Sequence, residues 1–466
     1  MTQPFEYIGF WWLPDSPQEK VSGILKFDPI KGCTLDLIGT LADIYEGERE
    51  RYFELIVGVT KDSKLVSLLR CLEISYGSST PGFSRATYSI QTILVGHLFN
   101  KLDDIVFSDL NLSYTYLNEW VGIAGFKTEE KHNEKGHFVS KTVSYEFPKE
   151  IEARIGDCNI KISFMLNDNA DVNKVALSQK TLISIHPSQP ASFDTTMSKF
   201  GYPLQTFLTL SIGEAVHLLF AEGKTQKVYF DLPDGSVFLK PIEFFRPLPE
   251  SIEPNKRLQD YQMLFTLKDI ADIFETCLQN WFSKEEALRP AYELYFGVMS
   301  SKSMYVQHQF LSLVRAIESY HRRTLPGKYV SDEQNQDISK CLLEAIPPWV
   351  EGNFRQSLKQ RFKYQHEFSL RKRLSNILDK FTSMVDTFLD NKESFIEAVV
   401  NTRNYLTHLD KDSKTFAITE PIELYNMTQK LRAILEVCFM GELGIPSEKI
   451  IAIISRNDRF RSLRKN

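Results

Sequence analysis

The sequence has few of the features that mark secreted, disulfide-rich or membrane proteins. Its 466 residues include six cysteines, and no two of them form a Cys-x-x-Cys pair; this usage is typical of reduced thiols in a cytoplasmic protein. No run of about 18 apolar residues is present, and the first residues lack a basic region followed by an apolar one. We therefore expect a cytoplasmic protein with no membrane partner.

Several common catalytic signatures are also missing. The chain has no glycine-rich phosphate loop, no Gly-x-Ser-x-Gly elbow and no His-Glu-x-x-His zinc motif. His132 and His137 are spaced like metal ligands, but the Lys- and Glu-rich residues between them are typical of an exposed loop. We expect neither a cofactor nor a bound metal.

What is present is an ordinary globular composition, with 42% hydrophobic and 25% charged residues. The length predicts two or three domains with ample material for a core. The formal net charge is −5, but lysine and arginine outnumber aspartate and glutamate after residue 300, whereas acidic residues dominate before it. A mildly basic C-terminal part suits binding to a polyanion.

The first 262 residues read as a β-rich region. Segments 51–59, 87–95 and 236–240 are rich in β-branched and aromatic residues, and turn formers such as Pro233-Asp234-Gly235 bound them. These patterns predict a large antiparallel region layered as a sandwich, with a helical insertion near 204–220.

The pattern becomes helical from about residue 263 to the end. The spacing of Ser283 and Glu286 indicates a capping box that opens a helix. Apolar residues recur at helical spacing in 305–323. Further helices are predicted at about 353–365, 370–390, 392–409 and 420–443. The chain is thus expected to be α+β, with a β-rich region over 1–262 and a helical bundle over 263–466.

One constellation in the helical part could carry chemistry. Arg403 is followed by the polar Asn404, and His408 comes five positions after the arginine. Arginine is a permanent cation that holds phosphate oxygens in a two-pronged fork, and histidine exchanges a proton near neutral pH. With the 2′-hydroxyl of RNA as a built-in nucleophile, these groups suffice to cut RNA without a metal. The alternative is a purely structural role, in which His408 caps a helix end and Arg403 forms an ion pair.

The spacing alone is weakly specific. Arg315 with His321 and Arg361 with His366 also fit an arginine followed by histidine five or six positions later, and chance supplies about one such match in a chain of this composition. Only Arg403 is followed by a polar residue. The third match is therefore the candidate catalytic motif.

The helical geometry limits how this motif could work. Residues five apart on an α-helix differ by about 140° around the axis and by about 7.5 Å along it. Either the helix unwinds at Thr407-His408-Leu409, or two copies of the motif face each other across a two-fold interface. We expect both. The segment 410–413 reads as a loop, which places His408 in the last helical turn.

A basic stretch precedes the motif. It has aromatic residues between its charges, a mixture that could hold a phosphate backbone, although the preferred interpretation is a solvated helix face with core aromatics beneath it. Glu318, on an earlier helix, could support Arg403 or His408 or could simply pair with a neighbouring arginine. The basic residues considered for RNA binding are Lys359, Arg361, Lys363, Arg371, Lys372 and Arg373.

The motif and two further segments resemble a known family. Residues 265–466 are similar to the HEPN superfamily, whose ribonuclease members carry an Arg-polar-x-x-x-His motif. The sequence Glu442-Leu443-Gly444-Ile445, and the opening 9–14 (Gly-Phe-Trp-Trp-Leu-Pro), resemble the ApeA-like group of anti-phage defence proteins. The resemblance covers nearly the whole chain.

The resemblance implies a metal-independent endoribonuclease that dimerises through its HEPN domain and halts phage by damaging RNA, with transfer RNA as one candidate substrate. It also implies that the β-rich region senses a phage-derived trigger or restrains the nuclease. The alternative is a catalytically silent HEPN module that dimerises or binds nucleotide, with a β-rich domain that binds a protein or glycan. In that alternative Trp11 and Trp12 would supply an aromatic binding surface.

Overall fold

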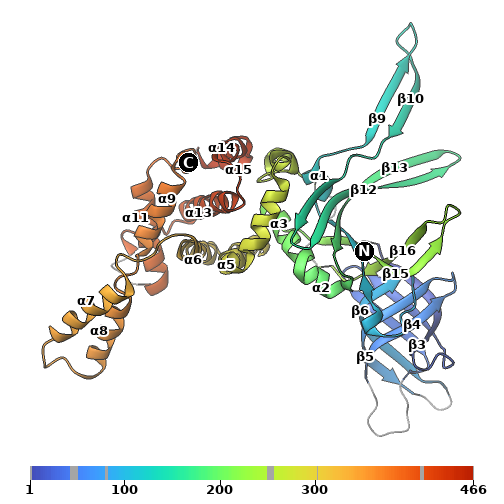
Figure 1. Cartoon of the computed structure of the whole chain (residues 1–466), viewed down its shortest axis with the longest axis horizontal. Coiled ribbons are helices and arrows are strands. Elements are labelled where there is room, and N and C mark those ends of the chain that lie inside the picture. The colour runs from blue at the N-terminus through green and yellow to red at the C-terminus, as the bar shows by residue number, and fades with distance from the viewer. Residues whose placement is uncertain are drawn as a thin grey trace. The chain divides into compact units, whose positions relative to one another are not determined.

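The computed structural model describes residues 3–41, 51–78, 82–248, 257–301, 303–409 and 414–464. The chain divides into two compact units, Met1–Gln279 and Asn280–Asn466. The first holds β-sheets with short helices, and the second is helical (Figure 1). This confirms the predicted α+β fold class. The domain boundary predicted between residues 262 and 263 lies at the end of η3 (Asp260–Gln262). That the two parts are separate domains on either side of this boundary stays a prediction.

The strands of the first unit pair in antiparallel fashion. They are β1 (Phe5–Trp12), β2 (Val21–Asp28), β3 (Gly32–Ile38), β4 (Tyr52–Thr60), β5 (Leu65–Gly77), β6 (Arg85–Val95), β7 (Val106–Phe107), β8 (Asp109–Tyr114), β9 (Phe126–His132), β10 (Phe138–Tyr145), β11 (Ile151–Ile155), β12 (Cys158–Asp171), β13 (Lys174–Pro187), β14 (Ala191–Ser192), β15 (Leu218–Asp231) and β16 (Val237–Phe245).

Half of the large twelve-stranded sheet closes into a small barrel. Its strands run in the order β6-β3-β2-β1-β4-β5, and β5 pairs again with β6. Closure leaves no free edge in this ring. The predicted sandwich is therefore wrong here, because a pairing of β5 with β6 along most of their length joins the two ends of one sheet. The buried core includes Trp11, Leu25, Phe27, Leu35, Ile56, Leu68 and Tyr88.

Trp11 shows why this core needs glycine on a neighbouring strand. Its side chain is fully buried, and a Cβ built at Gly58 would lie only 2.3 Å from Cε3 of Trp11. Trp12 is 8% exposed. The two tryptophans are therefore core residues, and they form no exposed aromatic surface of the kind that the glycan-binding alternative requires.

The other half of the sheet extends from the barrel through the pairing of β16 with β6, in the order β16-β15-β8-β13-β12-β11. Short helical segments lie between these strands in the sequence. They are η1 (Leu102–Asp104), α1 (Leu117–Val121), α2 (Phe193–Thr196), the π-helical turn η2 (Met197–Gly201) and α3 (Tyr202–Ile212). The insertion predicted over 204–220 is wrong in its second half. Gly213, at φ 81°, ends α3, and β15 begins soon after.

The strands β9 and β10 form a separate two-stranded hairpin. His132 ends β9, His137 lies in the following turn, and both are exposed. The predicted exposed loop is confirmed.

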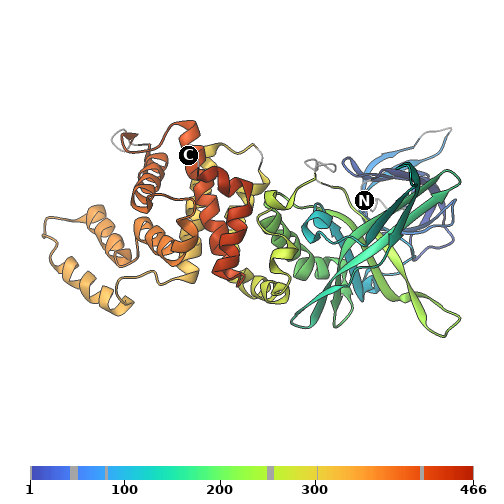
Figure 2. The ribbon, with the colours of Figure 1, turned by 90° about the horizontal axis from the view of Figure 1, so that it is seen from above.

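The helices that follow are α4 (Leu267–Ile270), α5 (Phe274–Ser300), α6 (Val306–Thr324), α7 (Asp332–Glu344), α8 (Gly352–Tyr364), α9 (Leu370–Lys380), α10 (Thr382–Val385), α11 (Lys392–His408), α13 (Pro421–Glu442), α14 (Ser447–Arg456) and α15 (Asp458–Leu463) (Figures 1 and 2).

Two helix predictions need correction. Ser283 lies inside α5 and does not cap it. The helix predicted over 370–390 is interrupted at Phe381, whose φ and ψ of −111° and 27° separate α9 from α10. In the described part of the chain, none of the helices combines the length and apolar character needed to cross a bilayer.

The helix α13 packs against α6 in the second unit and carries its most buried charge. Glu436 is fully buried, accepts a hydrogen bond from Tyr295 Oη at 2.7 Å and from Arg432 Nε at 2.9 Å, and pairs with Arg459. Burial alone would raise the pKa of Glu436, but Arg459 and Arg432 lower it overall. The carboxylate therefore remains charged and links α5, α13 and α15.

Candidate functional site

The motif helix α11 begins and ends with clear local signals. Asn391 precedes it, and its Oδ1 accepts a hydrogen bond from Ser394 N at 2.9 Å. At the other end Leu409 adopts a left-handed conformation, φ 53°, and its N–H bonds to Tyr405 O at 2.6 Å. One face of α11 is buried, through Phe395, Ile396, Val399 and Thr402, and packs against α6 and α9. This packing fixes the rotation of α11 and so determines where the motif residues point.

Arg403 is held from two sides. Its Nη1 donates a hydrogen bond to Oδ1 of Asn404 at 3.1 Å, and its Nη2 lies 3.7 Å from Oε1 of Glu318 on α6. The arginine side chain keeps about a third of its surface exposed, 34%. The polar residue after the arginine thus orients the guanidinium, which still faces solvent.

A pocket of about 430 Å³ lies at this guanidinium. Its lining includes Arg403 and Thr407 from α11 and Leu311, Arg315 and Glu318 from α6. Arg315 therefore brings a second cation to the same pocket. In the sequence, Arg315 stood out only as part of a rival motif. Its spacing of three residues from Glu318 places the two on one helix face, and this spacing could have indicated that Arg315 belongs to the site.

His408 is the last residue of α11 and is exposed. The helix is regular through His408 and the chain leaves it at Leu409, so the predicted unwinding is wrong for Thr407 and His408. Since five helical positions turn the axis by about 140°, Arg403 and His408 point to different sides within one chain. The pairing of two copies stays a prediction, and the loop 410–413 lies outside the described residues.

A group of large apolar side chains is exposed at the end of α11, just before α6 and in the first two turns of α13. We call it the apolar rim and define it by Tyr305, Leu409, Ile422 and Tyr425, which are 76%, 69%, 69% and 48% exposed. Tyr305 and Leu409 line a second pocket, of about 640 Å³, together with Leu424 of α13. Tyr305 and Leu409 therefore lie at one pocket, and all four side chains of the rim are large and exposed.

The histidines of the two rival motifs have structural roles. His321 is fully buried; its Nδ1 lies 3.1 Å from Arg373 Nη1 and its Nε2 3.4 Å from the amide nitrogen of Asn376. Burial, followed by the charges of Arg373 and Arg322, lowers the pKa of His321 to about 4. The imidazole is thus neutral near pH 7 and accepts a hydrogen bond from arginine.

The second rival histidine, His366, is also buried, with Nε2 2.8 Å from Oδ1 of Asp332. The hydrogen bonds from Lys328 and His366 hold the pKa of Asp332 below its usual value. His366 therefore pairs with a charged carboxylate at the base of the α7–α8 hairpin and is not an exposed proton-transfer group.

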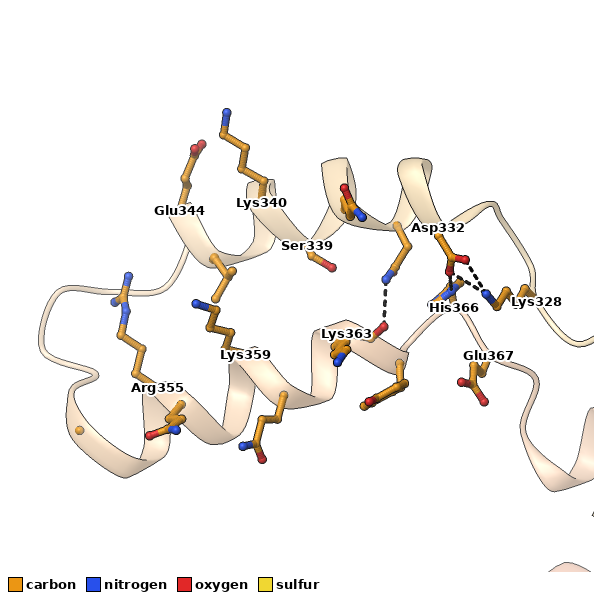
Figure 3. A pocket seen from close by; sticks show the side chains of 17 residues that line it. Lys328, Asp332, Ser339, Lys340, Glu344, Arg355, Lys359, Lys363, His366 and Glu367 are labelled. Carbon is orange, nitrogen blue, oxygen red and sulfur yellow. Dashed lines mark hydrogen bonds and ion pairs between the residues drawn. The ribbon is translucent and has the colours of Figure 1, made fainter.

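The basic stretch is divided by the fold. Lys359 and Lys363 line a groove between α7 and α8, whereas Arg361, on the same helix, is exposed outside that lining (Figure 3). Arg371 and Lys372 are exposed on α9. These residues remain predictions for RNA binding.

Arg373 is the exception, and its predicted place on an exposed basic surface is wrong. It is 1% exposed, its Nε donates to Phe368 O at 3.0 Å, and its Nη2 lies 3.5 Å from Glu367. The guanidinium of Arg373 thus makes its hydrogen bonds inside the bundle, including one to His321. Among the residues that the structure describes, no group of three or more His, Cys, Asp or Glu side chains is placed to hold a metal ion.

The comparison with protein families agrees with this architecture. Residues 6–281 match the family model ApeA N-terminal domain 1, and residues 311–449 match the model Apea-like HEPN. The second match contains Arg403, Asn404, His408 and Glu318. No curated protein and no solved structure matches the chain significantly. The chain therefore belongs to the ApeA family, with an N-terminal ApeA domain followed by an ApeA-like HEPN domain.

Proposed function

We propose that this protein is an endoribonuclease of an anti-phage defence system, with Arg403, Asn404 and His408 as its catalytic residues. The observation that carries the proposal is the guanidinium of Arg403, oriented by Asn404 and Glu318 at a solvent-open pocket, five residues before the exposed His408. HEPN domains are generally associated with RNA cleavage, and this family with defence against phage.

The proposed reaction needs only groups of the chain and of the RNA. His408 accepts the proton of a 2′-hydroxyl, and the 2′-oxygen forms a bond to the adjacent phosphorus. The bond from phosphorus to the 5′-oxygen breaks, and that oxygen takes a proton from solvent. Arg403 stabilises the negative charge that grows on the phosphate oxygens. The products are a 2′,3′-cyclic phosphate and a 5′-hydroxyl end, and no metal ion takes part.

Two protomers build each site in this proposal. Because Arg403 and His408 diverge on α11, one phosphate meets both groups only when Arg403 of one protomer faces His408 of another. The exposed apolar side chains of the rim, which include Leu409 directly after His408, support this pairing, since exposed apolar surface commonly marks interfaces. The predicted homodimer thus forms around the ends of the two α11 helices.

The remaining parts of the proposal follow the family. RNA is the substrate, with transfer RNA as one candidate, and the β-rich unit senses a phage-derived trigger or restrains the nuclease in the cytoplasm of the infected cell. Damage to cellular RNA would then stop phage by abortive infection. These roles rest on analogy with the family, since a shared fold does not fix function.

The test is incubation of the purified full chain with total cellular RNA in the presence of a chelator. We expect fragments ending in 2′,3′-cyclic phosphate, and no such fragments from His408→Ala or Arg403→Ala. The matched control is His137→Ala, which removes an exposed histidine on the β9–β10 hairpin and should cut normally. Undiminished cleavage by His408→Ala would rule out the proposed mechanism.

A further inference from the structure

The helices α7 and α8 form a hairpin held together mainly at one end. Among their described residues only Asn335 is buried. Its amide nitrogen lies 3.3 Å from Phe362 O and 3.1 Å from Lys363 O, and Ser339 Oγ lies 3.1 Å from Phe362 O. Beyond these polar contacts the two helices are separated by a groove of about 1320 Å³, into which side chains of both project (Figure 3).

The groove has more cations than its own acids neutralise. Arg355, Lys359 and Lys363 line it from α8, and Lys340 belongs to the lining from α7 with its amine pointing away from α8 (Figure 3). All four are exposed. Within the part of the chain that the structure describes, none of these four has an ion-pair partner. Four uncompensated positive charges along one channel favour an elongated anion.

Two of the three carboxylates in the groove lining already have cationic or histidine partners. Asp332 is hydrogen-bonded to His366 at 2.8 Å, and Glu367 pairs with Arg322 on α6 at 2.5 Å. Glu344 is a third carboxylate in the lining. The inner end of the groove is therefore locally neutral, whereas Lys340, Arg355 and Lys359 share the open part with the carboxylate of Glu344 (Figure 3).

We propose that the α7–α8 groove binds the phosphate backbone of a single-stranded RNA segment next to the cleaved bond. The inference rests on the proposed ribonuclease function and names the surface that guides its substrate. Arg355, Lys359 and Lys363 recur every four residues, so they lie on one face of α8 about 6 Å apart. That repeat suits successive phosphates of an extended strand.

Other side chains of the groove favour a single strand over a duplex. Gln336, Gln356 and Gln360 line it with amides that donate and accept hydrogen bonds, the groups that read exposed base edges. Tyr364 is 57% exposed in the same lining, and Lys363 Nζ lies 5.2 Å from its ring centroid, so the groove offers an aromatic ring for a base next to a cation for its phosphate. A duplex would keep its bases away from both kinds of contact.

The helix α6 connects this groove to the catalytic arginine. Glu318, which contacts Arg403, and Arg322, which pairs with Glu367 of the groove lining, are four residues apart on α6. They therefore share one helix face and lie about 6 Å apart along the axis. A strand that leaves the inner end of the groove is thus directed along α6 toward Arg403.

The test measures binding of a fluorescent single-stranded RNA to the full chain carrying His408→Ala, so that the RNA stays intact. Affinity is recorded by anisotropy over a range of salt concentrations. The double substitution Lys359→Gln and Lys363→Gln removes two positive charges that would each contact a phosphate. It should weaken binding and make the slope of log affinity against log salt shallower by about 1.4. Lys340→Gln, on the opposite helix, should reduce the slope by about 0.7.

The matched control is Lys135→Gln, which removes one exposed charge from the β9–β10 turn outside the groove, and it should leave the slope unchanged. Thermal unfolding of each variant establishes that the exposed substitutions keep the fold. An unchanged slope in the Lys359, Lys363 and Lys340 variants would overturn the groove assignment, even if the parent protein cleaves RNA normally. Conversely, the predicted slopes without any cleavage by the parent would support the groove and reject the ribonuclease proposal.

Competition distinguishes RNA from an acidic protein. Unlabelled single-stranded RNA should displace the probe, whereas polyglutamate of equal charge should displace it poorly. If polyglutamate binds with the same dependence on Lys359 and Lys363 while RNA does not bind, the groove is a docking site for an acidic protein and the RNA assignment is wrong.

Discussion

Glu318 on α6 and Arg403 on α11 meet at the pocket that both line, with Oε1 of the carboxylate 3.7 Å from Nη2 of the guanidinium. The catalytic candidate therefore depends on how two helices pack and not on its own helix alone. Together with Asn404, Glu318 limits the directions that the guanidinium can take.

Removing this contact should slow cleavage more than it affects folding. We expect Glu318→Gln to lower kcat by up to about 10²-fold, because a shift of a catalytic group by about 1 Å costs that much. A partly exposed ion pair with its atoms 3.7 Å apart stabilises the fold by about 1 kcal/mol. The control is Glu397→Gln, an exposed position on α11. Single-turnover cleavage and thermal unfolding measure the two effects, and equal kcat values for the two variants would refute a positioning role.

Ile422→Asp should separate the proposed dimer without unfolding the monomer. Ile422 belongs to the apolar rim and lies in the first turn of α13, where a carboxylate is favourable to the helix. Burying that charge in an interface should weaken dimerisation roughly thirty-fold or more, about 2 kcal/mol. Sedimentation velocity measures the change. Ile30→Asp, at an exposed turn of the β-rich unit, serves as the control, and dimerisation that survives Ile422→Asp argues against the rim as the interface.

Two inactive variants should restore activity when mixed. If each site takes Arg403 from one protomer and His408 from the other, a dimer of Arg403→Ala with His408→Ala contains one complete site. Random exchange in an equal mixture then restores about a quarter of the original rate. The mixture is assayed for cleavage after subunit exchange, beside each variant alone. A mixture that is no more active than its components would place both groups on one chain.

His321 should make the helical unit sensitive to mild acid. Its pKa in the folded protein is about 4, because burial and the nearby Arg373 and Arg322 disfavour the charged ring, whereas the unfolded chain titrates near 6.5. Between these values the unfolded state binds more protons, so stability falls as pH drops from about 6.5 to 4, by on the order of 3 kcal/mol.

The measurement is the free energy of unfolding at pH 7 and pH 4.5 in the parent and in His321→Gln, which keeps a hydrogen-bond acceptor for Arg373. The difference between the two pH values should shrink in His321→Gln. It should stay as in the parent in His137→Gln, where the histidine is exposed. The same acid sensitivity in all three proteins would exclude His321 as its source.

Local signals in the sequence predicted the elements that carry the motif. The helix expected over 392–409 is α11, Lys392–His408, and the one expected over 420–443 is α13, Pro421–Glu442. Both have helical periodicity and clear end signals, which do not depend on distant parts of the chain.

Features that depend on distant contacts were not predictable in this way. The barrel closes through β5 and β6, and no periodicity within a strand reveals which strand will be its neighbour. Arg373 resembles its basic neighbours in sequence, but His321, 52 positions away, buries it. The same holds for Arg315, which acquires its place beside Arg403 only when α6 packs against α11.

The central claim is that the RNA cuts itself through its 2′-hydroxyl while Arg403 and His408 assist. The most direct measurement is cleavage of an RNA that carries a single 2′-deoxynucleotide immediately before a mapped cleavage site. We predict that cleavage stops at that bond and continues at unmodified sites in the same molecule. Cleavage of the deoxy-substituted bond at the original rate would contradict the mechanism, because the attacking oxygen would then have to come from elsewhere.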